Sequence, residues 1–421
     1  MARNLFAKLS LENELSTSTP IANSQIEPED VVDAISVNDE TTESEREINA
    51  NIDTLEEAND TLDDLQEIDN NAADALNEDR VNILSGEPIN STDTNSDVEV
   101  PKNPEVAAAV AQEALKRVYR KLGCANKFKV TFEEIHSSPI SALKLAREEA
   151  QEAGKSLWER IKAFFIRVWE TIKAFFGNVQ AQINKNVDII NKLLERLKDM
   201  HFEGRKPLSE ELVNLILETG VPLSRDKEPE NIEIYLLWYG KYLDQFVRYS
   251  GQLSDAAAKL IDNKPIDQPD VELILARATA AVDGDVNADV KPEILLGFPI
   301  DENVRNKNKE LLTTAPTNSC VTTLNALLRK INSSEEDIRN IKTAMDKIAK
   351  AIKTSKKEDV HPLLPKILTI LTKVSKSYGK DLLRLSKVLI RIVKESIDAE
   401  KDNKTETKTD SETNDTMEKL K

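Results

Sequence analysis

The residue types that most often carry enzyme chemistry are few in this chain of 421 residues. There are three histidines, His136, His201 and His361, and none has a metal-ligating residue three or four positions after it. The two cysteines, Cys124 and Cys320, do not form a Cys-x-x-Cys pair. Zinc sites depend on such spacing, because several ligands must converge on one ion. We therefore expect neither a metal nor a cofactor.

Nucleophile and phosphate motifs are equally scarce. Gly154-Lys155-Ser156 resembles the end of a phosphate-binding loop, but Glu149 stands where the motif requires its first glycine. There is no Gly-x-Ser-x-Gly elbow and no Gly-x-Gly-x-x-Gly turn. We interpret the two cysteines as small apolar residues of a core rather than as nucleophiles. The sequence thus predicts a protein that is not an enzyme.

A duplicated amphipathic segment is the most informative pattern. The run WERIKAFF at 158–165 recurs as WETIKAFF at 169–176, an offset of 11 residues. Eleven residues make three helical turns plus about 20°, so both copies face the same side of one helix. The large apolar side chains of this predicted packing or docking face are Trp158, Ile161, Phe164, Phe165, Trp169, Ile172, Phe175 and Phe176.

Two interpretations of this aromatic face stay open. An aromatic face with basic residues opposite it suits a membrane interface or a partner helix. The apolar stripe also continues past Gly177 with Leu, Ile and Val at helical spacing, which is typical of a core helix. We favour packing within the protein or between copies of it, and we keep membrane contact as the alternative.

A basic stripe is predicted on the last helix. Lysines and arginines recur there every three to four residues, a spacing that could follow the phosphates of packaged DNA. A solvated polar face is the more ordinary interpretation. The stripe consists of Lys373, Lys376, Lys380, Arg384, Lys387, Arg391 and Lys394.

Helical signals dominate the elements that must position these side chains. A short alternating segment at 128–135 is the one indication of a strand. The predicted fold class is all-α, with long antiparallel helices in a bundle behind a disordered acidic N-terminal arm. The predicted helices cover residues 105–122, 140–200, 208–219, 231–262, 270–282, 320–353 and 363–398.

The charge is divided unequally along the chain. Residues 1–104 hold 26 acidic and 5 basic side chains, a net charge of −21, whereas the rest of the chain carries +3. We expect 1–104 to be a disordered leader with a marginal helix near 45–80, because it offers little apolar surface to bury. A helical connector at 105–152 and an all-α mature domain at 153–397 follow. A disordered charged tail is expected at 398–421.

Three features together resemble the internal head (inner-body) proteins of giant phiKZ-like tailed bacteriophages. They are the opening MARNLFAKLSLENE, the acidic arm, and the duplicated Trp-x-x-Ile-x-x-Phe-Phe helix. The resemblance covers residues 1–20 and 140–200. It implies a virion structural protein in the virion interior, present in the host cytoplasm before assembly. The implied partners are the prohead protease and other capsid or inner-body proteins, and self-association is possible.

The resemblance also implies removal of an acidic propeptide. The family's protease cuts after a small residue, any residue, then Glu, a pattern that occurs often by chance in a Glu-rich chain. A cut after Glu152 would leave a leader of −20 and a product of +2. A membrane-associated protein or a cytoplasmic helical scaffold are the alternative functions. The candidate cleavage positions are Glu12, Glu87, Glu113, Glu148 and Glu152.

Overall fold

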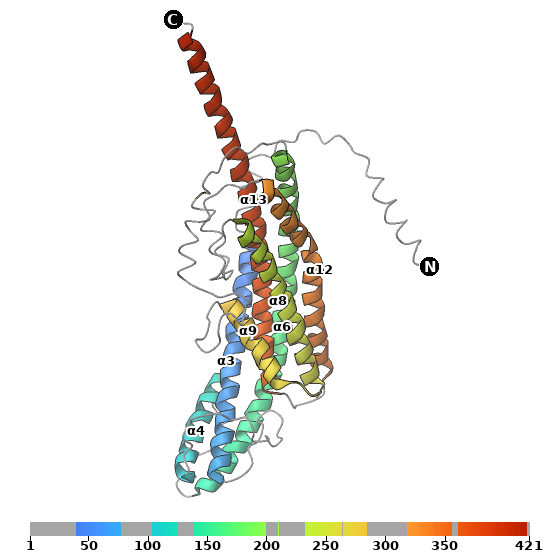
Figure 1. Ribbon diagram of the computed structural model, residues 1–421. Helices are drawn as coiled ribbons and strands as arrows, with labels where there is room; N and C mark the ends of the chain where they lie inside the picture. Colours follow the sequence, from blue (N-terminus) through green and yellow to red (C-terminus); the bar gives the residue numbers. More distant parts are fainter. Residues whose placement is uncertain are drawn as a thin grey trace, which may run out of the picture. The chain divides into compact units, whose positions relative to one another are not determined.

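Helices make up all the regular structure of the described part of the chain (Figure 1). The computed structural model describes residues 39–76, 103–123, 138–198, 209, 232–262, 264–283, 318–355 and 361–418. The chain divides into Met1–Ser36 and Val37–Lys421, and every described residue belongs to the second unit. The predicted all-α fold class is therefore confirmed.

The helices correspond closely to those predicted from the sequence. Two predicted elements, the helix at 208–219 and the strand at 128–135, fall outside the described residues except for Ser209. The elements are α3 (Asp39–Leu76), α4 (Pro104–Lys121), α6 (Pro139–Lys198), α8 (Ile232–Ile261), α9 (Gln268–Asp283), α12 (Asn318–Thr354) and α13 (Leu363–Glu418).

Local sequence fixes where α4 begins and ends. The side chain of Asn103 accepts a hydrogen bond from the backbone N–H of Glu105 at 3.0 Å, and Pro104 occupies the first turn, where no N–H is needed. Beyond the last turn, Gly123 has a φ of +64°, a left-handed conformation that only glycine adopts without strain. Its N–H bonds the carbonyl of Arg120 at 3.0 Å, which closes the helix.

The last helix, α13, is the centre of the bundle. It packs against α3, α6, α8, α9 and α12, and from Leu364 to Ile397 Lys366 alone is exposed. Buried hydroxyls are satisfied within the helix itself: Ser375 donates to the carbonyl of Leu371 at 2.8 Å. The helix continues to Glu418, beyond the end expected near 398. No proline or glycine follows Gly379 to stop it.

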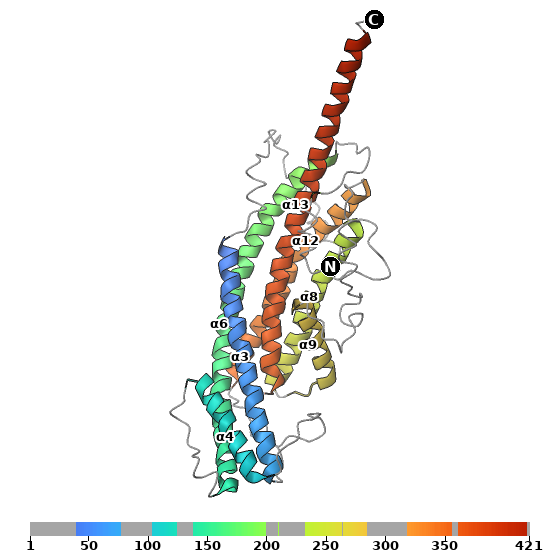
Figure 2. The same ribbon diagram turned by 90° about the vertical axis from the view of Figure 1, so that its left-hand side faces the viewer.

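The acidic helix α3 is longer and more deeply packed than the marginal helix expected near 45–80. It lies beside α6 and α13 and also contacts α4 (Figures 1 and 2). Its apolar residues recur at helical spacing and find partners in the same chain, which explains why this part of the acidic segment is helical. The fully or almost fully buried ones are Ile48, Ile52, Leu55, Leu62, Leu65 and Ile68.

Candidate functional site

The duplicated segment lies in the middle of α6, and its apolar face is turned into the bundle. Seven of its eight large apolar side chains are at most 3% exposed, and Phe164 is the partly exposed one. No described helix combines the length and the apolar character that crossing a membrane requires. The structure thus places this face against other helices of the same chain.

The two copies have the same local geometry. The ammonium of Lys162 lies 5.5 Å from the ring centre of Trp158, and that of Lys173 lies 5.3 Å from the ring centre of Trp169. Each lysine also pairs with the glutamate three residues before it. Residues three and four positions apart share one helix face, so the repeated sequence reproduces the same contacts.

The partners of the two copies differ. In the second copy, the indole N–H of Trp169 donates to Asp346 of α12 at 2.7 Å. The ring of Phe175 lies so close to Gly379 of α13 that a Cβ there would come within 2.5 Å of it. In the first copy, the indole N–H of Trp158 is buried without a hydrogen-bond partner among the described residues.

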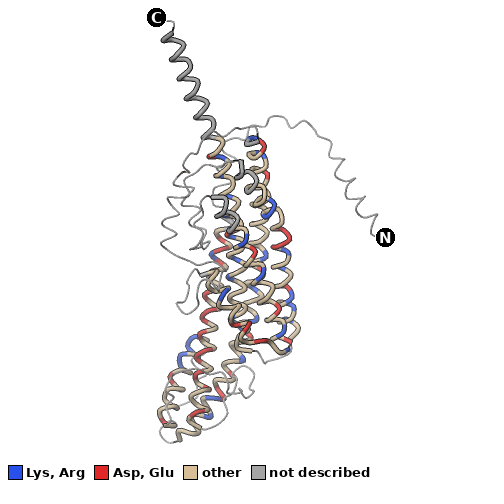
Figure 3. The backbone as a smooth tube through the Cα atoms, in the orientation of Figure 1, with Lys and Arg blue, Asp and Glu red and all other residues tan. Residues whose placement is uncertain are grey.

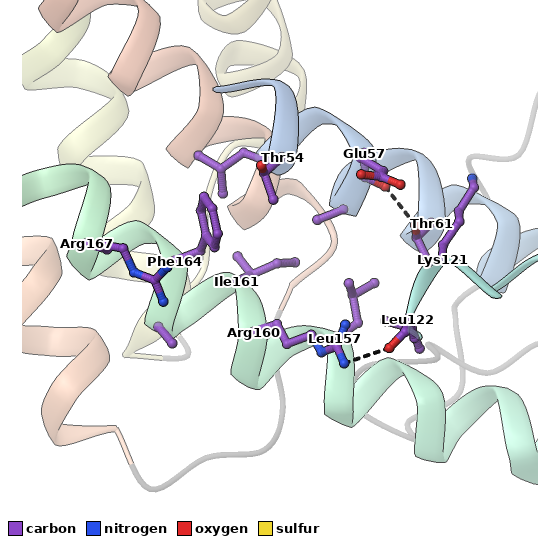
Figure 4. Close-up of a pocket in the computed structure, with 13 residues that line it drawn as sticks. Thr54, Glu57, Thr61, Lys121, Leu122, Leu157, Arg160, Ile161, Phe164 and Arg167 are labelled. Carbon is purple, nitrogen blue, oxygen red and sulfur yellow. Dashed lines mark hydrogen bonds between the residues drawn. The ribbon is translucent and has the colours of Figure 1, made fainter. Parts of the chain in front are cut away.

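A groove borders the first copy where α3, the end of α4 and α6 meet (Figure 4). Its volume is about 250 Å³, and Leu55, Ile161 and Phe164 are among its lining residues. The guanidinium of Arg160 donates to the carbonyl of Leu122 at 2.7 Å and so caps the end of α4. The second copy is sealed by contrast, with Phe175 fully buried.

The basic stripe of α13 faces the acidic helix α3. The ammonium of Lys373 pairs with Glu56 at 2.7 Å, and that of Lys366 pairs with Asp63 at 3.1 Å. Burial lowers the pKa of Lys387, and the carboxylate of Glu45 opposes this effect. All seven predicted stripe residues are half-buried, so the solvated polar face expected from the sequence is corrected. Contacts with α3 account for the part of the stripe from Lys373 to Lys387.

The buried carboxyl of Asp381 is partly compensated by basic neighbours on the same helix. Burial raises the pKa of Asp381 to about 7, although Arg384 and Lys380 lower it. The hydroxyl of Tyr239 donates to the backbone carbonyl of this aspartate at 2.7 Å. The hydrogen bond from Tyr239 ties α8 to α13.

Sequence reasoning missed a partly buried cluster of charged and polar side chains around Lys330. Lys330 lies between Asp244 at 2.5 Å and Asp337 at 2.6 Å, and Tyr378 donates to Asp337 at 3.0 Å. Its members come from α8, α12 and α13, so no local motif signals them. Among the described residues, no group of three or more His, Cys, Asp or Glu side chains could hold a metal ion.

The structure places the predicted cleavage positions in two settings. Glu113 lies in α4, whereas Glu148 and Glu152 lie in α6, which runs without a break across the boundary expected at 152/153. Ala150, within the tripeptide that ends at Glu152, is fully buried. The other two positions, Glu12 and Glu87, fall outside the described residues.

Part of the chain that contains this site is similar to a known protein family. Residues 23–208 match the family model of the phiKZ-like phage internal head proteins. The match includes α3, α4, α6 and both copies of the repeat, so the resemblance seen in residues 140–200 is confirmed, whereas residues 1–20 lie outside the match. Comparisons with curated proteins and with solved structures gave no match.

Proposed function

We propose that the protein is a structural component of a phage virion, packed inside the prohead, whose acidic leader the prohead protease removes during maturation. The match of residues 23–208 to the internal head proteins carries this proposal. The role is non-enzymatic. The partners are the prohead protease and other capsid or inner-body proteins. The product stays in the virion interior after assembly from the host cytoplasm.

The division of charge supports removal of the leader. A cut after Glu87 gives a leader with 23 acidic and 4 basic residues, −19, and a product with 52 acidic and 53 basic residues, +1. This division is close to that from a cut after Glu152. An interior crowded with acidic leaders would repel the incoming genome, because both are strongly negative. Removing the leader relieves that repulsion.

Helical context favours Glu87 over the other internal positions. A protease cleft accepts extended backbone, so a cut within a helix requires local unfolding. Glu113, Glu148 and Glu152 are all inside α4 or α6. A cut after Glu87 falls within no described helix and would separate α3 from α4.

The burial of the aromatic face supports packing as its role. For α6 to dock on a membrane, it would have to leave α3, α12 and α13, which it contacts now. Returning one buried large apolar side chain to water costs roughly 1.5–3 kcal/mol. Seven of the eight side chains of this face are buried, so undocking α6 would cost a large free energy and the membrane alternative gains no support from the structure.

Mass spectrometry of purified heads tests the proposal. We expect peptides from residues 88–421 at high abundance, a new N-terminus after Glu87, and loss of leader peptides relative to uncleaved proheads. A Glu87→Gln chain should keep its leader, whereas a Glu78→Gln chain, which changes no cleavage tripeptide, should be processed normally. Intact leader at full abundance in mature heads would contradict the proposal.

A further inference from the structure

The basic residues of α13 share one side of the helix. Between Leu363 and Ile397 the helix carries eight basic and two acidic residues. At 100° per residue, all eight basic positions fall within an arc of about 80°. They are the seven stripe residues named above together with Lys366.

The helix that covers this stripe has the opposite charge. Within α3 there are 14 acidic residues and a single basic one, Arg46. The contacts run antiparallel: Asp63 pairs with Lys366, and Glu56 pairs with Lys373. Glu45, further back in α3, acts on Lys387, further along α13. The acidic helix therefore lies lengthwise on the stripe from Lys366 to Lys387, and acidic positions recur along it in Figure 3.

The exposed ion pair between Lys366 and Asp63 contributes little to holding α3 in place. The side chains of Lys366 and Asp63 are 45% and 59% exposed, and pairs of this kind contribute at most about 1 kcal/mol. Burial of Ile48, Leu55 and Leu62, each at most 1% exposed, contributes roughly 1.5–3 kcal/mol per side chain. The charges thus add mainly specificity, and α3 neutralises a surface that would otherwise be strongly positive.

We propose that α3 is an intramolecular cover for a surface of α13 that binds the phosphates of double-stranded DNA. The inference rests on the proposed function, since loss of the leader is what detaches α3. From Lys366 to Lys394 the stripe is about 42 Å long at 1.5 Å per residue, longer than one turn of a DNA duplex, about 34 Å. The acidic helix occupies the place that DNA would take.

The interface has an opening at which this exchange could begin. A polar cleft of about 210 Å³ lies where α3, α9 and α13 meet. Carboxylates from Asp53 and Glu56 and ammonium groups from Lys373 and Lys376 line it. Salt and polyanions can reach these paired charges without prior unfolding of the bundle, so competition for the lysines is possible in the folded chain.

Controlled cleavage of the full chain tests the cover. A recognition sequence for a specific protease replaces residues 91–100, between α3 and α4, and binding of a labelled 20-base-pair duplex is followed by fluorescence anisotropy before and after the cut. We expect the cut protein to bind at least tenfold more tightly. With four phosphate contacts, its affinity should fall about 100-fold between about 50 and 200 mM salt. Equal binding by the cut and uncut protein would overturn the inference.

The cut α3 fragment could stay on the bundle, so its release is measured as well. We expect the duplex to displace the fragment, which gel filtration separates from the complex. If the duplex neither binds nor displaces the fragment, the inference fails. If purified heads contain the cleaved protein but the cleaved protein does not bind DNA, this inference is refuted while the proposed function still holds.

Matched charge variants identify the surface. Replacing Lys373, Lys380 and Arg391 by Gln in the cleavable chain should weaken binding by the cut protein at least tenfold. Circular dichroism checks that these variants remain helical.

A second set of variants, Glu56→Gln with Asp63→Asn, leaves the stripe intact and should strengthen DNA binding by the uncut protein. The control removes three exposed lysines of α12, at Lys347, Lys350 and Lys353, and should bind like the unaltered cut protein. Equal losses in both lysine sets would overturn the assignment to α13.

Discussion

The two copies of the repeat in α6 have nearly the same sequence but different surroundings. Both place a lysine over a tryptophan ring, at 5.5 Å and 5.3 Å. The first copy lies beside α3, the end of α4 and a groove of about 250 Å³. The second is closed by α12 and α13, through Asp346 and Gly379. The repeated sequence therefore sets the local geometry, whereas the partner helices decide how much each side chain stabilises the fold.

This difference matters for the proposed maturation. The groove at the first copy is formed partly by α3, which a cut after Glu87 would separate from the rest of the chain. The helices α12 and α13, which close the second copy, lie after the cut, and α3 touches that copy through a hydrogen bond from Thr171 to Glu47. Loss of the leader would then expose the first copy more than the second, and the new apolar surface could pack against other inner-body proteins.

The largest expected difference comes from the phenylalanines at matching positions. Phe175→Ala removes a fully buried ring and should lower the free energy of unfolding by about 3–5 kcal/mol. Phe164→Ala should cost about 1–2 kcal/mol, because Phe164 is partly exposed and already lines a cavity. Urea unfolding followed by circular dichroism measures both. Equal losses would mean that the two copies are equally packed.

The next largest change in stability is expected at Gly379, where α13 lies very close to the second copy. In Gly379→Ala the new Cβ would lie 2.5 Å and 2.9 Å from two atoms of the Phe175 ring. This overpacking should destabilise the protein by about 1–3 kcal/mol. The control is Gly177→Ala, where nothing lies within 4 Å of the new Cβ. It should stabilise the helix by about 0.5–1 kcal/mol.

A double variant shows whether the ring is the cause. Phe175→Leu shortens the side chain that the new methyl group would meet. In the Phe175→Leu background, Gly379→Ala should therefore cost at least about 1 kcal/mol less than in the unaltered chain, as expected for residues in contact. An unchanged cost would place the strain elsewhere in α13.

The tryptophans should show a smaller difference. Trp169→Phe removes the hydrogen bond to Asp346, whereas Trp158→Phe removes none that the described residues make. We expect Trp169→Phe to lower the free energy of unfolding by about 1 kcal/mol more than Trp158→Phe does, which is the usual net value of one hydrogen bond. Asp346→Asn in the Trp169→Phe background should add little. The denaturant midpoints of the four chains give the comparison, and a larger loss from Trp158→Phe would reverse it.

Much of this arrangement could be predicted from sequence because its determinants are local. Helical signals predicted α4 and α6, and the offset of 11 residues predicted that both copies share one face. The depth to which α3 is packed could not be predicted. Its sequence is strongly acidic, and only the partner helices, mainly α6 and α13, make burial of its apolar residues favourable.

The cluster around Lys330 was missed for a related reason. Its partners Asp244 and Tyr378 come from other helices, far apart in the chain. Charge spacing did predict the basic stripe, but it gave no information about which element lies over it. That the cover is α3 follows from tertiary contacts alone.

The smallest expected effect is at the lysines, where the copies are most alike. Lys162→Gln and Lys173→Gln each remove one ring contact and one ion pair with a glutamate that is 67% or 60% exposed. Each should cost about 0.5 kcal/mol, since exposed pairs of this kind contribute little. Lys173 also lies 3.7 Å from Asp346, which adds at most a few tenths of a kcal/mol in about 0.1 M salt. Thermal unfolding at low and high salt should therefore bring the two variants together as the salt rises. A difference in unfolding temperature between the two variants that persists at high salt would show that the lysines, and not only the aromatic rings, distinguish the copies.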